Sequence, residues 1–337
     1  MQYDPDTSRM KAILLREFGG PEQMYLGEAE APEAGEGQVL IRVHATSVNR
    51  PDVIQREGNY APPKGDSDIL GLEVAGEVVA TGNGVTSWQE GDRVFALIGG
   101  GGYAEYAIAW AGHCIPVPEQ MSFNQCACIC ETYITAYLNV FRLGGLAQGE
   151  TVLLHGGGGG VNTAAIQLCR NLVPSATIIV TASTGKTDRV KELGADHVID
   201  YRTEDFAERV RECTDGKGAD VILDHLGASY LAPNMKCLAV GGRLVEIGVM
   251  GGPKAELNIA LMMVKRQQII GSVLRPRSVT EKAEIIQDFR GTVMPLFETG
   301  KIAPLISDMY SLDKAAEAHR AMQAGTHFGK IVLQVMT

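Results

Sequence analysis

A run of five glycines carries the clearest chemical signal in the sequence. Gly157 and Gly159 hold the first two positions of a G-x-G-x-x-G pattern, directly after the strand-like run 151–155 and before helical spacing over 161–172. Such glycines permit a tight turn and let backbone amides approach a pyrophosphate, while the helix N-terminus contributes free N–H groups and a partial positive charge. The sequence therefore predicts a dinucleotide site from Thr151 to Leu172, with contacts from Gly157, Gly159, Gly160 and Val161.

The third glycine of the pattern is missing, because Asn162 stands in its place. A side chain there could cost ~1–3 kcal/mol if no space is made for it, or its amide could cap the helix or reach a phosphate oxygen. Five glycines also lose more chain entropy when they grip a ligand. The alternative is a turn without a ligand. The second glycine run, Gly99–Gly102, precedes a strand-like segment and is predicted to be a structural loop.

The end of the second predicted strand bears on the choice of cofactor. An NAD site places an acid there for the ribose 2′-hydroxyl, but the segment 181–186 has none. The hydroxyls of Ser183 and Thr184 and the cation of Lys186 suit a 2′-phosphate. We therefore predict NADPH over NADH, and the alternative for Lys186 is a solvated lysine in the first turn of a helix.

The seven cysteines and seven histidines suggest no metal site or disulfide framework. Cys126, Cys128 and Cys130 alternate, so a strand would place three thiols on one face. Zinc sites usually combine C-x₂₋₄-C pairs, and no second pair exists here. Small buried residues in a packed segment are the favoured interpretation. His155, just before the glycine turn, receives no catalytic role.

Three regions of different character position these residues. The segment up to about Cys130 has short strands and Gly/Pro turns, which predict a mostly antiparallel β domain. The middle alternates strands with helices, the pattern of a parallel doubly wound sheet. In the tail we expect one helix over 285–300, a second opened by Ser311, and a closing strand over 329–335 that returns to the first domain.

Composition and charge exclude several classes of protein. The 337 residues suffice for two domains, and the formal net charge of −10 without a Lys/Arg run argues against nucleic-acid binding. No apolar run is long enough to span a membrane, and the first nine residues lack the apolar core of a signal peptide. We expect a cytoplasmic protein with a disordered leader over 1–9.

Longer stretches resemble the medium-chain dehydrogenase/reductase superfamily, specifically its zinc-independent quinone oxidoreductase (zeta-crystallin-like) branch. They include MKAILLREFGGPE, GEGQVLIRVHATSVNRPDVIQREGNY, LGLEVAGEVVATG and KELGADHVIDYRTEDF. The resemblance implies an α/β chain with a GroES-like, mostly β catalytic domain (1–131 and 278–337) and a Rossmann dinucleotide-binding domain (132–277). It also implies a homodimer that reduces quinones or other α,β-unsaturated carbonyls with NADPH.

The same resemblance bears on zinc. Zinc alcohol dehydrogenases of the superfamily carry Cys at the position of Asn49 and His at that of Leu72, and their third ligand, a Cys, falls near Glu131. The four-cysteine structural lobe is also absent. Three protein ligands and an open position cannot be assembled from these residues, so we predict no metal.

Two residues take catalytic roles from the resemblance. Tyr60 matches a substrate-pocket tyrosine whose phenol could donate to the carbonyl oxygen, and Asn49 matches an asparagine beside the nicotinamide and its ribose. The alternatives are an exposed loop aromatic for Tyr60 and a turn residue for Asn49. Further cofactor positions carry over to Thr135, Tyr201, Gly248, Val249, Arg275 and Lys330.

Three functions compete at this point. The first is reduction of a quinone or enone by NADPH, with Tyr60 or water supplying the proton. The second is an enoyl-thioester or pathway-specific enone reductase with the same site but a different pocket. The third is a catalytically weakened NADPH-binding sensor, which the altered glycine turn motivates.

Overall fold

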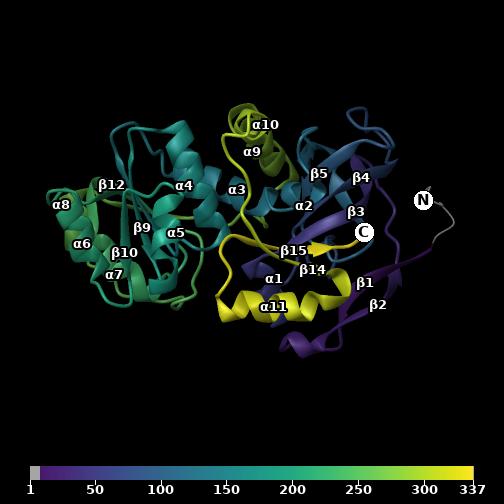
Figure 1. Cartoon of the computed structure of the whole chain (residues 1–337), viewed down its shortest axis with the longest axis horizontal. Helices are drawn as coiled ribbons and strands as arrows, with labels where there is room; N and C mark the ends of the chain where they lie inside the picture. The colour runs from purple at the N-terminus through teal and green to yellow at the C-terminus, as the bar shows by residue number, and fades with distance from the viewer. Residues whose placement is uncertain (1–7, 337) are drawn as a thin grey trace. The chain divides into compact units, whose positions relative to one another are not determined.

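The computed structural model describes residues 8–336, which form two compact units (Figure 1). Unit 1 comprises Met1–Ile134 and Arg275–Thr337, and unit 2 comprises Thr135–Leu274. The sequence predicted that the chain passes from one domain to the other at 131/132 and returns at 277/278. The predicted class, a GroES-like β domain with a Rossmann domain, is confirmed by the two sheets described below.

The main sheet of unit 1 has seven strands in the order β14-β15-β3-β4-β5-β7, with β6 paired to β3. Its N-terminal strands pair antiparallel, as predicted. Alternate residues such as Val39, Ile41 and Val43 are fully buried in its core. The strands are β3 (Gln38–Val48), β4 (Glu73–Thr81), β5 (Arg93–Leu97), β6 (Tyr106–Trp110), β7 (Cys114–Pro116), β14 (Ile306–Ser311) and β15 (Lys330–Gln334).

The remaining elements of unit 1 surround this sheet. A separate hairpin, β1 (Arg9–Leu15) and β2 (Met24–Glu30), opens the described chain. The leader predicted over 1–9 is therefore too long, since Arg9 pairs with Glu30, while residues 1–7 lie outside the described part. The helices are α1 (Arg50–Arg56), α2 (Phe123–Cys126), α3 (Cys130–Ala136, whose end enters unit 2), α9 (Val279–Thr292), α10 (Met294–Glu298) and α11 (Ala315–Ala324).

The tail returns to the first sheet, as the sequence predicted. β15 pairs antiparallel with β3, and β14 pairs in parallel with β15. The expected helix over 285–300 is two helices, because α9 ends before Val293 and α10 restarts with Pro295 in its first turn. A capping box of Ser278 and Glu281 begins α9 earlier than expected. Ser311 precedes a 3-10 turn over 312–314 without a side-chain capping bond, and α11 begins only at Ala315.

A chain of buried polar side chains connects α11 to α1, two helices that lie beside each other in Figure 1. Arg56 donates to Nδ1 of His319 over 3.1 Å, and because arginine only donates, Nε2 must carry the imidazole proton. Nε2 lies 3.0 Å from the Tyr103 hydroxyl, which donates to Asp52 over 3.1 Å. Burial lowers the pKa of His319 to about 3 and raises that of Asp52 to about 6. Every member is hydrogen-bonded, so the chain closes the unit without an orphaned charge.

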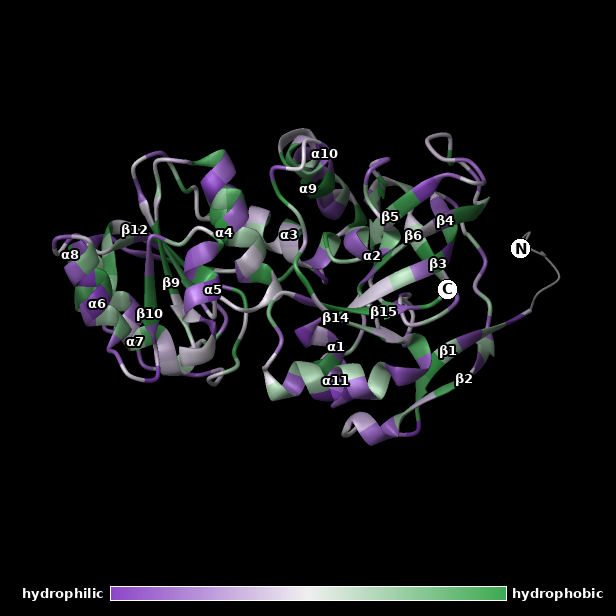
Figure 2. Cartoon of the chain, viewed as in Figure 1, coloured by the Kyte–Doolittle hydropathy of each residue, from purple (hydrophilic) through white to green (hydrophobic). Residues whose placement is uncertain are grey.

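Unit 2 is a parallel six-stranded sheet in the order β10-β9-β8-β11-β12-β13. Its central strands are nearly continuous apolar runs, coloured as hydrophobic in Figure 2, because helices cover both faces. The strand order reverses direction between β8 and β11, the position at which such sheets bind ligands. The strands are β8 (Thr151–His155), β9 (Thr177–Ala182), β10 (His197–Asp200), β11 (Ala219–Asp224), β12 (Leu238–Glu246) and β13 (Gln268–Gly271).

The helices of unit 2 were only partly predicted. The expected helices after β8, β9 and β10 are α4 (Gly160–Leu172), α5 (Thr187–Glu192) and α6 (Phe206–Cys213). Two further helices, α7 (Ala228–Cys237) and α8 (Ile259–Lys265), were missed. Pro233 lies inside α7, where the sequence indicates a break. α8 is short and has no buried residue, so its apolar side chains form no one-sided stripe.

Two smaller expectations also need correction. Cys126, Cys128 and Cys130 lie at the end of α2, in the following turn and at the start of α3, not along a strand. All three are buried, as the packing interpretation proposed. The strand predicted over 269–274 ends at Gly271. Across residues 8–336, no helix combines the length and apolar character needed to cross a bilayer.

Candidate active site

The glycine turn joins β8 to α4 at the carboxyl edge of the unit 2 sheet. Gly156 has φ +80°, which favours glycine, and its N–H donates to Thr181. A Cβ on Gly157 would come within 2.4 Å of Val180, and one on Gly158 within 2.4 Å of Cδ of Lys186. The turn therefore lies directly against β9 and the Lys186 side chain, and a side chain at Gly157 would overlap Val180. The first N–H groups of α4 have no acceptor within the helix.

Asn162 is held at the turn by hydrogen bonds to the main chain. Its buried Nδ2 donates to the carbonyl oxygens of His155 and, over 3.1 Å, of Gly156. The amide thus ties the first turn of α4 to the end of β8. Its Oδ1 is buried and has no hydrogen-bond partner among the described residues. The sequence left open whether the Asn162 amide caps the helix or reaches a phosphate oxygen. In the structure its Nδ2 instead bonds the main chain of the turn.

His155 belongs to the support of the turn. Its Nε2 donates to Asn234 over 2.8 Å, and its Nδ1 accepts from the Thr181 hydroxyl at 3.1 Å. Burial lowers the pKa of His155 to about 3, so the imidazole is neutral at pH 7. Asn234 in turn donates to Asp224 over 3.0 Å. This chain fixes the carboxyl ends of β8, β9 and β11 relative to one another.

The predicted 2′-phosphate residues follow β9. Ser183 precedes a 3-10 turn, Thr184–Lys186, and the exposed Thr184 hydrogen-bonds to Asp200 at the end of β10. A Cβ on Gly158 would lie 3.1 Å from Nζ of Lys186, so the ammonium group lies over the glycine turn. Burial, and then the nearby charge of Arg189, lowers the pKa of Lys186. The sequence analysis did not single out Arg189, a second cation in this region.

The other predicted cofactor residues of unit 2 are distributed along its sheet edge. Gly248 and Val249 follow β12, and a Cβ on Gly248 would lie 3.0 Å from the carbonyl oxygen of His225. Val249 is 60% exposed, and Tyr201, just after β10, is 41% exposed. Thr135 is half-buried at the start of unit 2, where its carbonyl accepts from Asn139 over 2.8 Å. Thr135 lies in α3, which precedes the first strand of the unit 2 sheet in the sequence.

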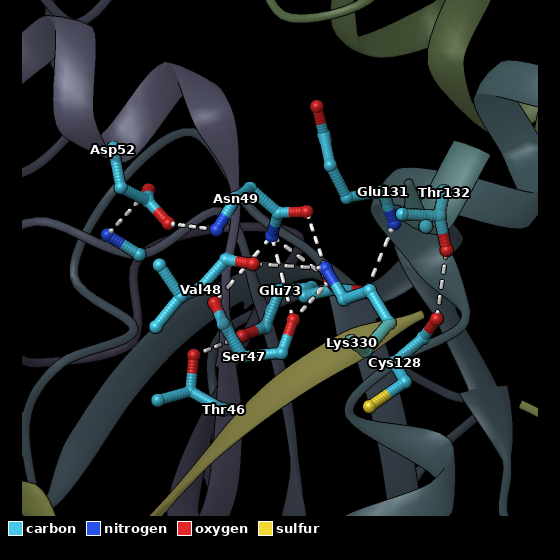
Figure 3. A network of polar contacts seen from close by, with 12 residues as sticks. Thr46, Ser47, Val48, Asn49, Asp52, Glu73, Cys128, Glu131, Thr132 and Lys330 are labelled. Atoms are coloured by element: carbon cyan, nitrogen blue, oxygen red, sulfur yellow. Dashed lines mark hydrogen bonds and ion pairs between the residues drawn. The ribbon is translucent and has the colours of Figure 1, made fainter. Parts of the chain in front are cut away.

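In unit 1, a buried carboxylate organises the polar residues around Asn49 (Figure 3). Glu73, fully buried at the start of β4, accepts through Oε1 from Ser47 at 2.5 Å, Asn49 at 2.9 Å and Lys330 at 3.1 Å. Its Oε2 accepts from the backbone N–H of Glu131 at 2.9 Å. Four donors converge on one carboxylate, which satisfies its charge and fixes the Asn49 amide.

Lys330 is engaged within this network. Its ammonium group donates to Asn49 Oδ1, to Glu73 and, over 3.2 Å, to the carbonyl of Val48. An ammonium has three protons, so all of them have acceptors in unit 1. In the structure the lysine holds Asn49, and the buried Lys330–Glu73 ion pair joins β15 to β4. The approach of Lys330 to the cofactor stays a prediction.

Arg275 is likewise directed at unit 1. Its guanidinium donates to Gly99 O at 2.8 Å, Gln55 Oε1 at 2.8 Å and Tyr60 O at 3.3 Å. It also stacks over the Tyr60 ring, 5.1 Å from the centroid. Arg275 therefore positions the Tyr60 loop, and Gly99 belongs to the loop that the sequence predicted to be structural. Burial, and then Glu131, raises the pKa of the half-buried Tyr60, whose phenol remains protonated at neutral pH.

Sequence reasoning assigned Glu131 no role of its own. It was named only because the third zinc ligand of the zinc enzymes falls near its position. It lies in the first turn of α3, is half-buried, and its side chain points away from the Glu73–Lys330 pair in Figure 3. Burial, followed by the charge of Glu73, raises the pKa of Glu131 to about 8. No pattern in the sequence marks this perturbation, because it arises from residues more than fifty positions away.

The residues at the three expected ligand positions do not fit zinc. Both ends of the Asn49 amide are hydrogen-bonded, Leu72 is apolar and buried, and Glu131 alone offers an oxygen donor. Within residues 8–336, no three His, Cys, Asp or Glu side chains group as metal ligands would. Burial also raises the pKa of Cys126 to about 12 and of Cys130 well above its usual value, which disfavours thiolate ligands.

Comparisons with known proteins agree with this architecture. Residues 35–119 match the family model described as the alcohol dehydrogenase GroES-like domain, and residues 193–333 match the zinc-binding dehydrogenase model. A rat (Rattus norvegicus) quinone oxidoreductase is 33% identical over 96% of this chain and 97% of its own. A zebrafish (Danio rerio) synaptic vesicle membrane protein VAT-1 homolog is 33% identical over 98% of this chain and 71% of its own.

Solved structures give the same result. A mycobacterial protein complexed with NADPH superposes with a TM-score of 0.87 at 29% identity, over 97% of this chain and 100% of the other. An enoyl reductase, JamJ, superposes with a TM-score of 0.87 at 26% identity, over 96% and 99%. The chain therefore belongs to the medium-chain dehydrogenase/reductase superfamily of oxidoreductases. Within that superfamily it is a member of the quinone oxidoreductase branch.

Proposed function

We propose that this protein is an NADPH-dependent oxidoreductase that reduces quinones or other α,β-unsaturated carbonyls by hydride transfer, without zinc. The observation that carries the cofactor preference is the position of Lys186, whose ammonium group lies over the glycine turn with Arg189 nearby. Two cations after β9, in a segment without an acid from 181 to 186, favour a 2′-phosphate over a free hydroxyl.

The residues of unit 2 fit a dinucleotide. A side chain at Gly157 or Gly158 would fill the space at the turn, and the 13-residue helix α4 directs its N-terminus there. Gly157, Gly159, Gly160 and Val161 would hold the pyrophosphate, and Ser183, Thr184 and Lys186 the adenosine phosphate. When bound, the nicotinamide supplies a hydride, so the protein has to bind the dinucleotide and manage the substrate's charge.

Unit 1 supplies polar groups for the carbonyl. Tyr60 is a hydrogen-bond donor held in place by Arg275, and it would polarise the carbonyl oxygen as negative charge develops there. Asn49 is held by Glu73 and Lys330, so its amide is preorganised and costs no reorganisation. These groups would polarise the carbonyl in place of a zinc ion, which the residues at the three expected ligand positions do not fit.

An enoyl-thioester reductase is the second candidate, and the likeness to the enoyl reductase JamJ favours it. Both candidates use the same hydride chemistry and differ in the pocket that receives the substrate. The third reading, a weakened NADPH-binding sensor, loses part of its motivation. Asn162 is seated by hydrogen bonds to the main chain and leaves the turn intact.

We also propose that the protein is a homodimer through the β13 edge of unit 2. β13 is the last strand of its sheet, so within residues 8–336 no strand neighbours its outer N–H and C=O groups. Exposed apolar side chains flank it, among them Ile269 at 38%, Met263 at 68% and Val264 at 79%. A second copy would continue the sheet and cover these side chains.

The test is a fluorescence titration of the purified protein with NADPH and with NADH, followed by addition of a small quinone or enone. We expect tighter binding of NADPH and oxidation once the acceptor is added. Comparable affinity for both cofactors would reject the preference for NADPH. Binding of NADPH without oxidation by any quinone, enone or enoyl thioester would favour the sensor.

A further inference from the structure

The proposed reaction needs a proton as well as a hydride, and unit 1 contains a carboxyl group suited to supply it. Glu131 lies in the first turn of α3 and is held by its main chain, because its N–H donates to Glu73 over 2.9 Å. The same Glu73 carboxylate accepts from Asn49 over 2.9 Å. Glu131 and Asn49 therefore flank one buried anchor, which fixes where the Glu131 side chain begins.

The Glu131 carboxyl group is available for chemistry. Its side chain points away from the network (Figure 3), and among the described residues none donates a hydrogen bond to its oxygens. The remainder of the network is saturated, since every Lys330 proton and the Asn49 amide have partners. Of the polar side chains around Asn49, Glu131 is the one that could exchange a proton without breaking an existing contact.

The charged and titratable groups that face Glu131 come from several elements. Glu73 on β4 and Asp52 on α1 favour its protonated form, whereas Lys330 on β15 and Arg275 after β13 favour the carboxylate. The Tyr60 phenol and Lys282 of α9 also interact with it electrostatically. Burial is the largest effect and raises its pKa to about 8. At pH 7 the protonated form then exceeds the ionised form about tenfold.

We propose that Glu131 is the general acid that protonates the reduced substrate, with Tyr60 acting as the hydrogen-bond donor to the carbonyl oxygen. This inference rests on the proposed function. When hydride adds to the electrophilic carbon of an enone, the π electrons move to the carbonyl oxygen and give an enolate. The O–H bond of Glu131 then breaks, its proton passes to the enolate, and water returns a proton to the carboxylate. One hydride and one proton are consumed for each substrate reduced.

This assignment differs from donation by Tyr60 in its pH dependence. The folded-state pKa of Glu131 is raised, so the acid is present below about pH 8 and is lost as the pH rises through that value. Tyr60, whose pKa is raised above its ordinary value of about 10, would lose its proton only in stronger base. The kcat/KM profile reports ionisations of the free enzyme, so the two acids are distinguishable.

The first experiment compares Glu131→Gln with the wild-type protein and with Glu298→Gln, an exposed glutamate remote from the network in sequence. We expect a fall of kcat/KM above about pH 8 in the wild type and in Glu298→Gln. Glu131→Gln should lower kcat about a hundredfold or more and lose this alkaline limb, while its NADPH affinity stays unchanged. Tyr60→Phe should lower kcat but keep the limb. Full activity of Glu131→Gln, or a limb that persists in it, would overturn the proposal.

The second experiment does not depend on turnover. Carbon-13 NMR of protein labelled at the glutamate carboxyls should show two groups titrating near pH 8, one of which disappears in Glu131→Gln. Glu246 in unit 2 also has its pKa raised to about 8 by burial and by Asp224, so Glu246→Gln serves to assign the other signal. If Glu131→Gln does not fold, Glu131→Asp should retain the limb at lower kcat, and a loss of the limb there would contradict the proposal.

The outcomes separate the two proposals. Wild-type turnover with an unaffected Glu131→Gln variant removes the acid role and leaves the proposed function standing. No oxidation of NADPH by any quinone, enone or enoyl thioester removes the proposed function and the acid role with it. A Glu131 carboxyl that titrates near pH 4 instead of 8 overturns the acid role alone.

Discussion

Replacing Lys330 with methionine removes one partner of the buried ion pair that joins β15 to β4. The side chains of Lys330 and Glu73 are 4% and 1% exposed, and their Nζ and Oε1 atoms lie 3.1 Å apart. Methionine keeps most of the apolar volume but leaves Asn49 Oδ1 and the Val48 carbonyl without this donor. Breaking such a buried pair costs ~3–5 kcal/mol. Glu73 keeps three other donors, so we expect about 3 kcal/mol.

The assay exploits the distribution of tryptophan. The chain has two tryptophans, Trp88 and Trp110, and both belong to unit 1. Intrinsic fluorescence during urea unfolding therefore follows this unit, while NADPH binding follows unit 2. The Lys330→Met variant should lose about 3 kcal/mol of unfolding free energy, and its thermal transition should fall by roughly 6–12 °C for a unit of this size.

Two further variants make the reasoning refutable. Lys301→Met removes an exposed lysine and should change the unfolding free energy by less than about 0.5 kcal/mol. The double variant Lys330→Met/Glu73→Gln removes both charges and should recover part of the loss, since no buried charge is left unpaired. A loss below about 1 kcal/mol for Lys330→Met, typical of an exposed ion pair, would refute the description of the network as a buried anchor.

Three other predictions concern unit 2. Lys186→Ala should weaken NADPH binding about ten- to a hundredfold, as loss of a charge-assisted hydrogen bond does, and should hardly alter NADH binding in the same fluorescence titration; equal losses would contradict a 2′-phosphate contact. Asn162→Gly removes two hydrogen bonds at about 1 kcal/mol each, so amide hydrogen exchange over 156–165 should accelerate, and an unchanged rate would dismiss the anchoring role. Ile269→Lys should convert the expected dimer to monomers by light scattering, whereas an intact dimer would exclude the β13 edge.

The fold was largely predictable because its signals are local. The buried-strand runs and the glycine turn depend on residues close together in sequence, and each corresponds to an element of the structure. The misses share a physical cause. Pro233 lies inside α7, although proline lacks the N–H that a helix interior uses, and the expected helix over 285–300 divides at Val293 because Pro295 favours a new first turn.

The roles of the candidate site residues stay predictions, but the structure shows contacts among them that the sequence did not reveal. The family resemblance supplied Asn49, Tyr60, Arg275 and Lys330. The sequence could not show that Lys330 and Arg275 donate their hydrogen bonds to acceptors within unit 1. Those contacts join positions more than two hundred residues apart. The raised pKa of Glu131 has the same origin, because burial and the charge of Glu73 exist only in the folded chain.

Transfer of deuterium from NADPH labelled at C4 of the nicotinamide tests the central claim most directly. The protein would be incubated with the labelled cofactor and a simple enone, and the product analysed by mass spectrometry and NMR. We predict one deuterium on the β-carbon of the saturated ketone for each NADPH oxidised, and a solvent-derived proton at the α-carbon. Bound NADPH that is never oxidised, or a product without label, would contradict the conclusion that this protein reduces α,β-unsaturated carbonyls by hydride transfer.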